Sequence, residues 1–587
     1  MQPASSNSGS GGSGGGSSAL KKWGPLAAII VVIAVVIVVI ASGGGGDDES
    51  SSTTAPAETT APTEAPDTSD GGGDGGSTSW AFPLSYPEAE ELGVVDDIDW
   101  GERCDTSVGR IAVIDYFAPF CMAPFSGDNG GATDQGVSAD EITIVHYMGP
   151  DGDPIINYIT DAIAVDDTNA QEKEVVADFI EYFERYYEFY GRSINLVTYE
   201  SSGLANDAVT ARADAQRIVE EYAPFAVIGG PALTNAFGDE LAARETLCIS
   251  CGGGSPEWYS ERDPYVWGID GSAEQKQVHV VEFIGKQLVG QPAVHAGEQF
   301  QQTERKFGLV YVESSAESKV LADLMVSRLT EVGAAPAEVI PYVLDPGSIQ
   351  QTATQVIAKL KASGVTSVIL STDPVAPRDF TREATSQEYF PEWIVAAATL
   401  TDTTAFGRSY DQEQWAHAFG VTSLAVHVNP EVSGYYALYK WWAGQEPAAD
   451  ESIGVYMPPF MLLMSALQSA GPDLTHENLA GAIRSFETIQ AVSQPWLTWG
   501  DHGIWSDPDY AGIDDATLFW WDPTATGPDE NRKEGTGMLF YVDGGQRYLP
   551  GAWPSVDRLF DPDGAVDVYD AAPAGEEPRD FPSPAGG

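Results

Sequence analysis

The chain has 587 residues, of which 43% are apolar, so it is long enough for two or three packed units. Its 87 acidic residues outnumber its 29 Lys and Arg residues, and the net charge of −58 argues against nucleic acids and anionic membrane surfaces as partners. Because Asp and Glu are spread along the whole chain, the charge favours a solvated acidic surface over a site that attracts cationic ligands.

The N-terminal region predicts a membrane tether. Residues 1–24 are rich in Ser and Gly and predict a disordered cytoplasmic segment. Residues 25–41 contain an uninterrupted apolar run of 16 residues, which as a helix rises about 24 Å and nearly spans a bilayer. Lys21 and Lys22 before this run place the N-terminus inside the cell. We therefore expect a single-pass protein of the cell membrane with the bulk of the chain extracellular.

A disordered acidic linker is predicted over residues 42–79, which are rich in Gly, Ser, Thr, Pro, Asp and Glu and show no periodicity. A cleaved signal peptide remains the alternative to a retained anchor, since Ile40-Ala41-Ser42 forms a weak cleavage site.

Four cysteines follow the linker, and an even number in an oxidising compartment favours disulfides. Three pairings are possible, and we expect sequence neighbours to pair, Cys104 with Cys121 and Cys248 with Cys251. The first pair closes a loop in an irregular extension over residues 80–140. A redox Cys-x-x-Cys is the alternative for the second pair, although that motif normally opens a helix and here it ends a strand. A four-cysteine zinc site is disfavoured because the two pairs are far apart.

The stretch after this extension alternates strands with helices. Four short apolar runs predict strands, namely Ile142–Tyr147, Ile194–Tyr199, Phe225–Ile228 and Thr246–Ser250. Apolar residues at helical spacing lie between the strands, in Glu172–Tyr190 and Asp207–Tyr222. This order predicts an α/β unit with a parallel sheet covered by helices on both faces. Such sheets bind ligands at the carboxyl ends of their strands.

A second unit repeats this plan, with strands at Phe307–Val312, Glu338–Val343, Val365–Leu370 and Trp393–Ala397. After Ala418–Thr422 we expect the chain to return to the first unit, and Thr517–Trp521 and Met538–Val542 predict two late strands. The predicted boundaries are residues 141–270 and 425–490 for lobe one, and residues 271–424 and 491–560 for lobe two. Residues 561–587, rich in Asp, Pro, Gly and Ala, predict a disordered tail.

Several segments in this order resemble the type I periplasmic binding proteins, and within them the branched-chain-amino-acid-type substrate-binding proteins of ABC importers. They are the run Asp207–Val219, AVIGG at Ala226–Gly230, YVWGIDGSAEQKQ from Tyr265, FGLVYVESSAES from Phe307 and SIQQTATQVIAKLKASGVTSVILST from Ser348. The likeness spans roughly Glu141–Phe486. It implies two Rossmann-like lobes with parallel sheets joined by a three-strand hinge, closure of the lobes over a ligand, and no catalysis.

The resemblance also implies candidate ligand residues in lobe one, which are Tyr147, Thr234, Ser250, Gly253 and Ser255. In amino-acid-binding relatives, hydroxyl and backbone N–H groups of two successive loops hold the ligand carboxylate. Thr234 matches this pattern and lies before a helix, whose N-terminus favours a carboxylate. Gly254 stands where relatives have Ser or Thr, so Ser255 or bare N–H groups would substitute. An ordinary N-cap or turn role is the alternative for the loop residues. Tyr147 ends the first strand, where it could line the cleft floor, and core packing is its alternative.

The candidates in lobe two follow the predicted strands and are Glu313, Ser318, Thr372, Asp373 and Thr399. Relatives often have a Tyr-Gly pair after the first strand to stack on the ligand, and this pair is absent here. Asp373 or Glu313 could pair with a ligand ammonium group. The alternative for each is an exposed carboxylate on an acidic surface.

Together these observations predict an extracellular solute-binding protein that captures a small polar ligand, an amino acid or a related compound, and delivers it to the permease of an ABC importer. The predicted partners are therefore the ligand, the permease and, through the N-terminal helix, the membrane. No cofactor or metal is expected, and the chain has neither a G-x-S-x-G elbow nor a phosphate-binding P-loop. A cell-surface sensor and a structural surface module remain the alternatives.

Overall fold

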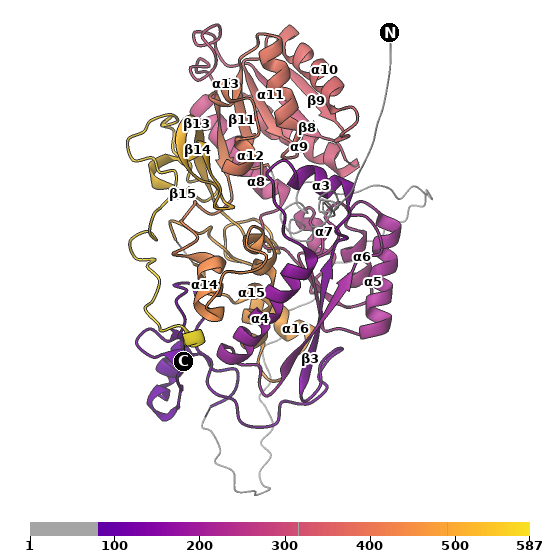
Figure 1. Cartoon of the computed structure of the whole chain (residues 1–587), viewed down its shortest axis with the longest axis vertical. Helices are drawn as coiled ribbons and strands as arrows, with labels where there is room; N and C mark the ends of the chain where they lie inside the picture. Colours follow the sequence, from indigo (N-terminus) through magenta and orange to yellow (C-terminus); the bar gives the residue numbers. More distant parts are fainter. Residues whose placement is uncertain (1–79, 315, 399, 490, 587) are drawn as a thin grey trace, which may run out of the picture.

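The computed structural model describes residues 80–314, 316–398, 400–489 and 491–586, which form two α/β lobes (Figure 1). The predicted membrane helix, the linker and Thr399 lie outside the described residues. An α/β architecture with two lobes built on parallel strands confirms the predicted fold class.

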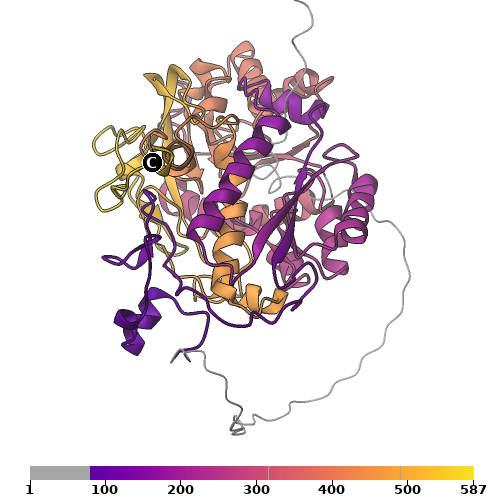
Figure 2. The same cartoon turned by 60° about the horizontal axis from the view of Figure 1, so that its bottom comes forward.

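Lobe one is built on a five-stranded parallel sheet with strand order β4-β3-β5-β6-β7. Its strands are β3 (Glu141–Met148), β4 (Ser193–Glu200), β5 (Ala226–Ile228), β6 (Leu247–Ile249) and β7 (Val266–Trp267). Its helices are α4 (Asn169–Tyr186), α5 (Ala208–Tyr222), α6 (Ala236–Ala243), α7 (Pro256–Ser260), α14 (Gly434–Ala443), α15 (Ile453–Ala470) and α16 (His476–Arg484). Helices α4 and α15 lie side by side (Figure 2). Among the described helices, only α15 is long and apolar enough to span a membrane, and it contributes to the lobe-one core.

Lobe two has an eight-stranded sheet with order β14-β13-β12-β11-β10-β8-β9, and β15 pairs with β13. The strands are β8 (Phe307–Val312), β9 (Glu338–Tyr342), β10 (Ser367–Ser371), β11 (Glu392–Ala396), β12 (Ala418–Thr422), β13 (Ala516–Pro528), β14 (Glu534–Tyr541) and β15 (Arg547–Tyr548). Its helices are α8 (Ala273–Phe283), α9 (Ala316–Glu331), α10 (Ile349–Ala362), α11 (Ala376–Ser386), α12 (Thr404–Gly407) and α13 (Gln412–Trp415). The last three strands pair antiparallel, so the sheet is parallel only in part.

The lobe boundary near residue 491 differs from the predicted one. Residues 491–512 pack on lobe one, because Trp499 and Tyr510 are buried in its core and the Tyr510 ring lies 5.3 Å from Trp267. The Gly268 carbonyl accepts hydrogen bonds from Trp499 Nε1 at 2.8 Å and from the backbone N–H of Gly512 at 3.2 Å. Lobe two therefore resumes at β13.

The C-terminal segment also differs from its predicted disorder. The backbone N–H of Tyr569 donates to the His427 carbonyl at 2.9 Å, and that of Arg579 donates to Ile114 at 2.9 Å. The Glu576 carboxylate accepts from the Val492 N–H at 2.6 Å, and the Phe581 carbonyl accepts from Trp441 Nε1 at 2.8 Å. A Pro-rich, mostly extended segment can thus satisfy its backbone on neighbouring loops, and it forms a short 3₁₀ helix at Pro584–Gly586 near its end.

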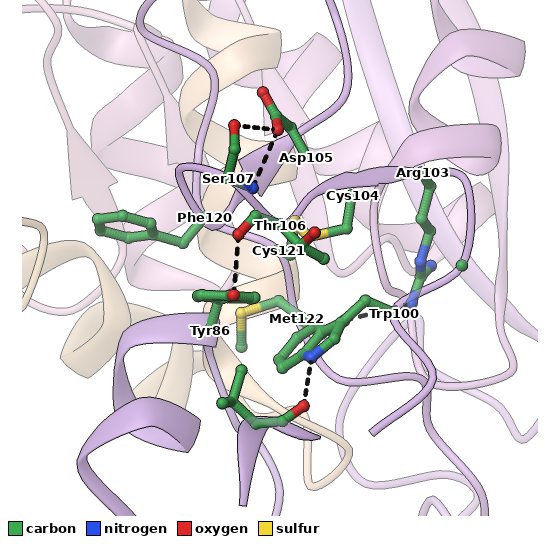
Figure 3. The surroundings of a disulfide bond; sticks show 12 residues. Tyr86, Trp100, Arg103, Cys104, Asp105, Thr106, Ser107, Phe120, Cys121 and Met122 are labelled. Carbon is green, nitrogen blue, oxygen red and sulfur yellow. Dashed lines mark hydrogen bonds between the residues drawn. A yellow bond between two sulfur atoms is a disulfide. The ribbon is translucent and has the colours of Figure 1, made fainter. Parts of the chain in front are cut away.

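The N-terminal extension is a small disulfide-linked module against lobe one (Figure 3). Its helix α2 (Tyr86–Leu92) begins with a capping box in which Ser85 and Glu88 bond reciprocally. Strands β1 (Cys104–Asp105) and β2 (Arg110–Ile111) pair antiparallel beside the Cys104–Cys121 disulfide. The Tyr86 hydroxyl donates to the Thr106 carbonyl at 2.9 Å. Cys248 pairs with Cys251, so both disulfides join the expected neighbours.

Candidate functional site

The two lobes meet across an apolar contact made by a short helix between β3 and α4. This helix, α3 (Pro154–Thr160), lies between the lobes (Figure 1). Ile156 and Ile159 are buried in the same apolar cluster as Val375 and Phe380 of lobe two. The Tyr158 hydroxyl accepts a hydrogen bond from Arg378 Nη2 of lobe two at 2.7 Å. The described structure is therefore a closed arrangement of the lobes.

A small cavity lies beneath α3 at the carboxyl ends of the lobe-one strands. Tyr147 lines it and donates a hydrogen bond to Ser201 Oγ at 2.7 Å. Burial raises the pKa of the Tyr147 phenol above its usual value, so this group stays neutral and acts as a donor. The other lining residues are Gly149, Pro150, Asp153, Ile156, Ala205 and Pro231. Tyr147 therefore borders this cavity, and its ring also packs in the lobe-one core against Tyr199 and Phe237.

A second small cavity lies directly between the lobes, with room for about one water molecule. Gly253, Gly254 and Tyr259 line it from lobe one, and Glu317 and Leu321 line it from α9 of lobe two. Gly271, Ser272 and Ala273 complete the lining, where the chain passes from β7 of lobe one into α8 of lobe two. The Glu317 carboxylate hydrogen-bonds to the backbone N–H of Ser255, which links the lobes across the cavity. Burial raises the pKa of Glu317.

Most of the predicted lobe-one residues have local structural partners. Thr234 Oγ1 accepts a hydrogen bond from the backbone N–H of Ala236 at 3.2 Å, at the start of α6. The Ser255 hydroxyl caps α7 by accepting from the Trp258 N–H at 3.1 Å. Asn235, which we did not predict, bonds both the N–H and the carbonyl of Gly253. Ser250 is buried at the end of β6 with a positive φ of 58°. The N-cap alternative thus describes Ser255, and the turn alternative describes Thr234, since Asn235 is the N-cap of α6.

Among the predicted lobe-two residues, Asp373 makes hydrogen bonds within its own lobe. Asp373 Oδ1 accepts from the N–H groups of Val375 and Ala376 at 2.8 and 2.9 Å. Its other oxygen accepts from the Tyr342 hydroxyl. The carboxylate is thereby committed to the start of α11 rather than to a ligand ammonium.

The other predicted lobe-two residues within the described chain are Glu313, Ser318 and Thr372. The Tyr311 hydroxyl donates to Glu313 at 3.3 Å, and Ser314 and Ser318 bond each other at 3.1 Å. The Thr372 hydroxyl is fully buried and has no hydrogen-bond partner among the described residues. It is the predicted lobe-two residue most available to a ligand.

Three charged residues that we did not predict lie together where the lobes join. Lys276 on α8 is 7% exposed and bonds Asp270 at 2.5 Å. Asp402, in the loop after β11, is 4% exposed and hydrogen-bonds to Thr422. Burial raises the pKa of Asp402 to about 7, although the nearby Lys276 ammonium lowers it.

One oxygen of Asp402 and one of Asp270 have no hydrogen-bond partner among the described residues. A buried carboxylate oxygen without a donor is costly, so a bound molecule or water that donates to these oxygens would be favoured. Two carboxylates facing one ammonium would accept a ligand that carries hydrogen-bond donors or positive charge.

Comparison with known proteins places these features in context. A family model described as periplasmic binding protein matches residues 164–512. No curated protein matches the chain. Similar solved structures include a solute-binding protein of an ABC transporter from Rhodopseudomonas palustris BisB5 in complex with 3,4-dihydroxybenzoic acid. That structure is 13% identical, with 71% of this chain and 98% of that chain covered and a TM-score of 0.46.

Two other structures are similar to the same extent. A fatty acid ABC transporter substrate-binding protein from Thermomonospora curvata is 15% identical, with 74% of this chain and 100% of that chain covered and a TM-score of 0.45. A branched-chain amino acid ABC transporter periplasmic ligand-binding protein from Burkholderia xenovorans LB400 is 12% identical, with 70% and 96% covered and a TM-score of 0.47.

Proposed function

Because this chain belongs to the periplasmic binding protein family, we propose that it captures a small polar solute, an amino acid or a related amine, between its lobes. Binding and release by lobe movement require no catalysis. We propose further that the N-terminal helix holds the protein on the outer face of the cell membrane, where it delivers the solute to the permease of an ABC importer.

The observation that carries the ligand proposal is the unpartnered oxygen of the buried Asp402 carboxylate. Asp402 lies after a strand of lobe two, at the edge of the sheet where α/β proteins bind ligands. A protonated amine would supply both the missing donor and the opposite charge. The fully buried Thr372 hydroxyl could bond a second polar group of the same molecule.

The test is a thermal-shift screen of the full-length protein in detergent against amino acids, amines, polyamines and small acids. A ligand at 100 times its Kd adds about 2.7 kcal/mol to the free energy of unfolding, which produces a clear shift in Tm. The proposal expects amines or amino acids among the hits. Hits confined to acids without an amine would contradict the proposed ligand class, and no hit at all would contradict solute capture.

The role of Asp402 is tested with a matched pair of variants. D402N should abolish the shift given by an amine ligand, because the amide cannot balance the ammonium charge. D411N removes the same charge from lobe two outside the cleft, where Asp411 caps α13 and Asn also caps well. It should bind like wild type. Equal binding by both variants would exclude Asp402 from the site.

Delivery to a permease has a ligand-sensing receptor as its alternative, since both begin with the same capture step. Uptake of the identified ligand by cells with and without this protein separates them. Loss of uptake supports import, and unchanged uptake supports a sensor.

A further inference from the structure

The hairpin between β13 and β14 carries its connecting residues, Asp529–Lys533, from lobe two to the surface of lobe one. Two of the chain's 29 basic residues, Arg532 and Lys533, lie in this hairpin tip. The hairpin lies beyond residue 512, where the match to the family model ends.

Both basic side chains contact lobe one directly. Lys533 Nζ lies 2.6 Å from Glu451 Oε1 and donates to the backbone carbonyl of Ala164 at 2.6 Å. Arg532 forms an ion pair with Asp450 and donates to its carbonyl at 3.0 Å. The Arg532 guanidinium also lies 4.1 Å from the centre of the Tyr436 ring. Asp450, Glu451 and Tyr436 all belong to the second segment of lobe one.

The same contacts extend to the segment that follows α3. The second oxygen of Glu451 accepts a hydrogen bond from the backbone N–H of Asp166 at 2.8 Å. Lys533 additionally donates to the Ile163 carbonyl at 3.2 Å. The hairpin tip therefore contacts lobe one at two places, the segment that follows α3 and the loop that contains Asp450 and Glu451.

The tip is held rigidly on lobe two. Glu530 accepts hydrogen bonds from the N–H groups of Thr404 and Ala405 at 2.7 and 3.0 Å, at the start of α12. Arg408 donates to the Lys533 carbonyl at 2.7 Å and to the Gly527 carbonyl at 2.7 Å. Because the tip is fixed to one lobe, its ion pairs with the other lobe must break when the lobes separate.

The backbone of the tip supports the same conclusion. Arg532 has a φ of 62°, in the left-handed region that side chains other than Gly, Asn and Asp rarely adopt. Such a conformation persists only where surrounding contacts compensate for it. The turn's own hydrogen bonds compensate for it here, because Asp529 Oδ1 accepts from the N–H groups of Asn531 and Lys533 at 3.0 and 2.9 Å.

From these contacts we propose that the tip of the β13–β14 hairpin is an electrostatic clasp that stabilises the closed arrangement of the lobes. Both lobes belong to a strongly acidic chain and repel each other, and the two cations of the tip offset that repulsion at one edge of the cleft. The consequence for ligand retention rests on the proposed function, whereas the clasp itself is a property of the ligand-free protein.

The experiment measures the separation of the lobes in the full-length protein without ligand. Spin labels carried by a keto amino acid replace Val209 on α5 and Val320 on α9, two exposed residues on different lobes. Pulsed electron paramagnetic resonance then gives the distance distribution. The clasp variant is R532A/K533A, and we expect its ratio of closed to open molecules to fall by about five- to tenfold.

The matched control is K319A/K359A. It removes the same charge, but Lys319 pairs with Asp323 and Lys359 pairs with Glu338, all within lobe two. It should keep the wild-type distance distribution. An equal shift in the control would show a general charge effect and overturn the clasp.

A second variant tests the proposal even if R532A/K533A disturbs the folding of the tip. D450N/E451Q removes the acidic partners on lobe one and leaves the hairpin unchanged. It should produce the same shift as R532A/K533A, and combining both changes should add little because they break the same contacts. Wild-type distances in D450N/E451Q would overturn the proposal. Since no ligand is present, failure to find a solute leaves this result unaffected.

Discussion

Asp509 and Asp514 form a buried carboxyl pair beside the segment that leads from lobe one back to β13 of lobe two. Burial raises the pKa of Asp514, although this carboxylate accepts hydrogen bonds from Thr498 Oγ1 and Trp505 Nε1, each at 2.6 Å, that act in the opposite direction. Burial, and then the charge of Asp514, raise the pKa of Asp509 to about 9. At neutral pH Asp509 therefore retains its proton.

The raised pKa of Asp509 predicts that the free energy of unfolding falls as the pH rises. The pKa of Asp509 is higher in the folded state than its usual value of 3.8, so the folded protein binds the proton more tightly. Its contribution to stability is complete below about pH 4 and is lost as the pH rises toward 9. D509N, which cannot ionise, should flatten the fall in unfolding free energy between pH 6 and pH 9, measured by urea denaturation.

The control for this measurement is D507N, an exposed carboxylate two residues away. It should keep the wild-type pH slope. A wild-type slope in D509N would instead mean that Asp509 is ionised in the folded protein.

Single residues show where sequence reasoning succeeds and where it does not. Lys276 lies at helical spacing with the buried Val280 and Phe283, and a charged residue within such a stripe could have indicated a functional group. Asp373 precedes a proline and a helix, a pattern typical of a cap as well as of a ligand contact. Asp402 follows a predicted strand, but only the fold shows that it faces Lys276.

At the scale of elements, the N-terminal extension depends on its disulfide. Its core contains Leu84, Trp100 and Ala123 with a few neighbours, too little apolar area to stabilise a unit independently. The Arg103 guanidinium connects it to lobe one through Glu188 at 2.6 Å. The Cys104–Cys121 bond, with a sequence separation of 17, restricts the unfolded form of this segment.

Removing this bond should therefore loosen the extension selectively. C104A/C121A is expected to lower the local unfolding free energy by about 3 kcal/mol, the chain-entropy value for a loop of this size. Hydrogen exchange of the amides of Ala112 and Ala123, which donate to the carbonyls of Arg103 and Leu84, reports the change. Amides of β3 serve as the internal control, and faster exchange there as well would show that the bond stabilises the whole lobe.

Helices and strands long enough to show several apolar repeats could be predicted from the sequence, whereas short inserted elements could not. The alternation of strands and helices from Ile142 onward gives the sheet of lobe one, because apolar periodicity is a direct consequence of burial. Helix α3 has only seven residues and a proline at its start, so it is too short for its apolar residues to show a helical repeat. Its position between the lobes depends on contacts with Val375 and Phe380, which are more than 200 residues away in the sequence.

For the whole molecule, the net charge of −58 sets the response to salt. Self-repulsion of an acidic chain destabilises the compact state, and ions screen it over about 10 Å at 0.1 M. The Tm of the full-length protein should therefore rise between 0.05 and 1 M NaCl. Sucrose at equal osmolality is the control for solvent effects. A Tm that stays constant or falls in NaCl would mean that attractive pairs such as Arg305–Glu392 outweigh the repulsion.

Both ends of the described chain lie against lobe one. Phe82 packs on Phe125, which packs on Tyr190 of lobe one, and at the other end the Ser583 hydroxyl donates to the Trp441 carbonyl at 2.5 Å. The two segments approach each other at one pole of the molecule (Figure 1). A mechanical load applied at these two described ends therefore reaches lobe one before it reaches the hinge or the clasp. Tension on the chain would act first on the lobe that holds both ends.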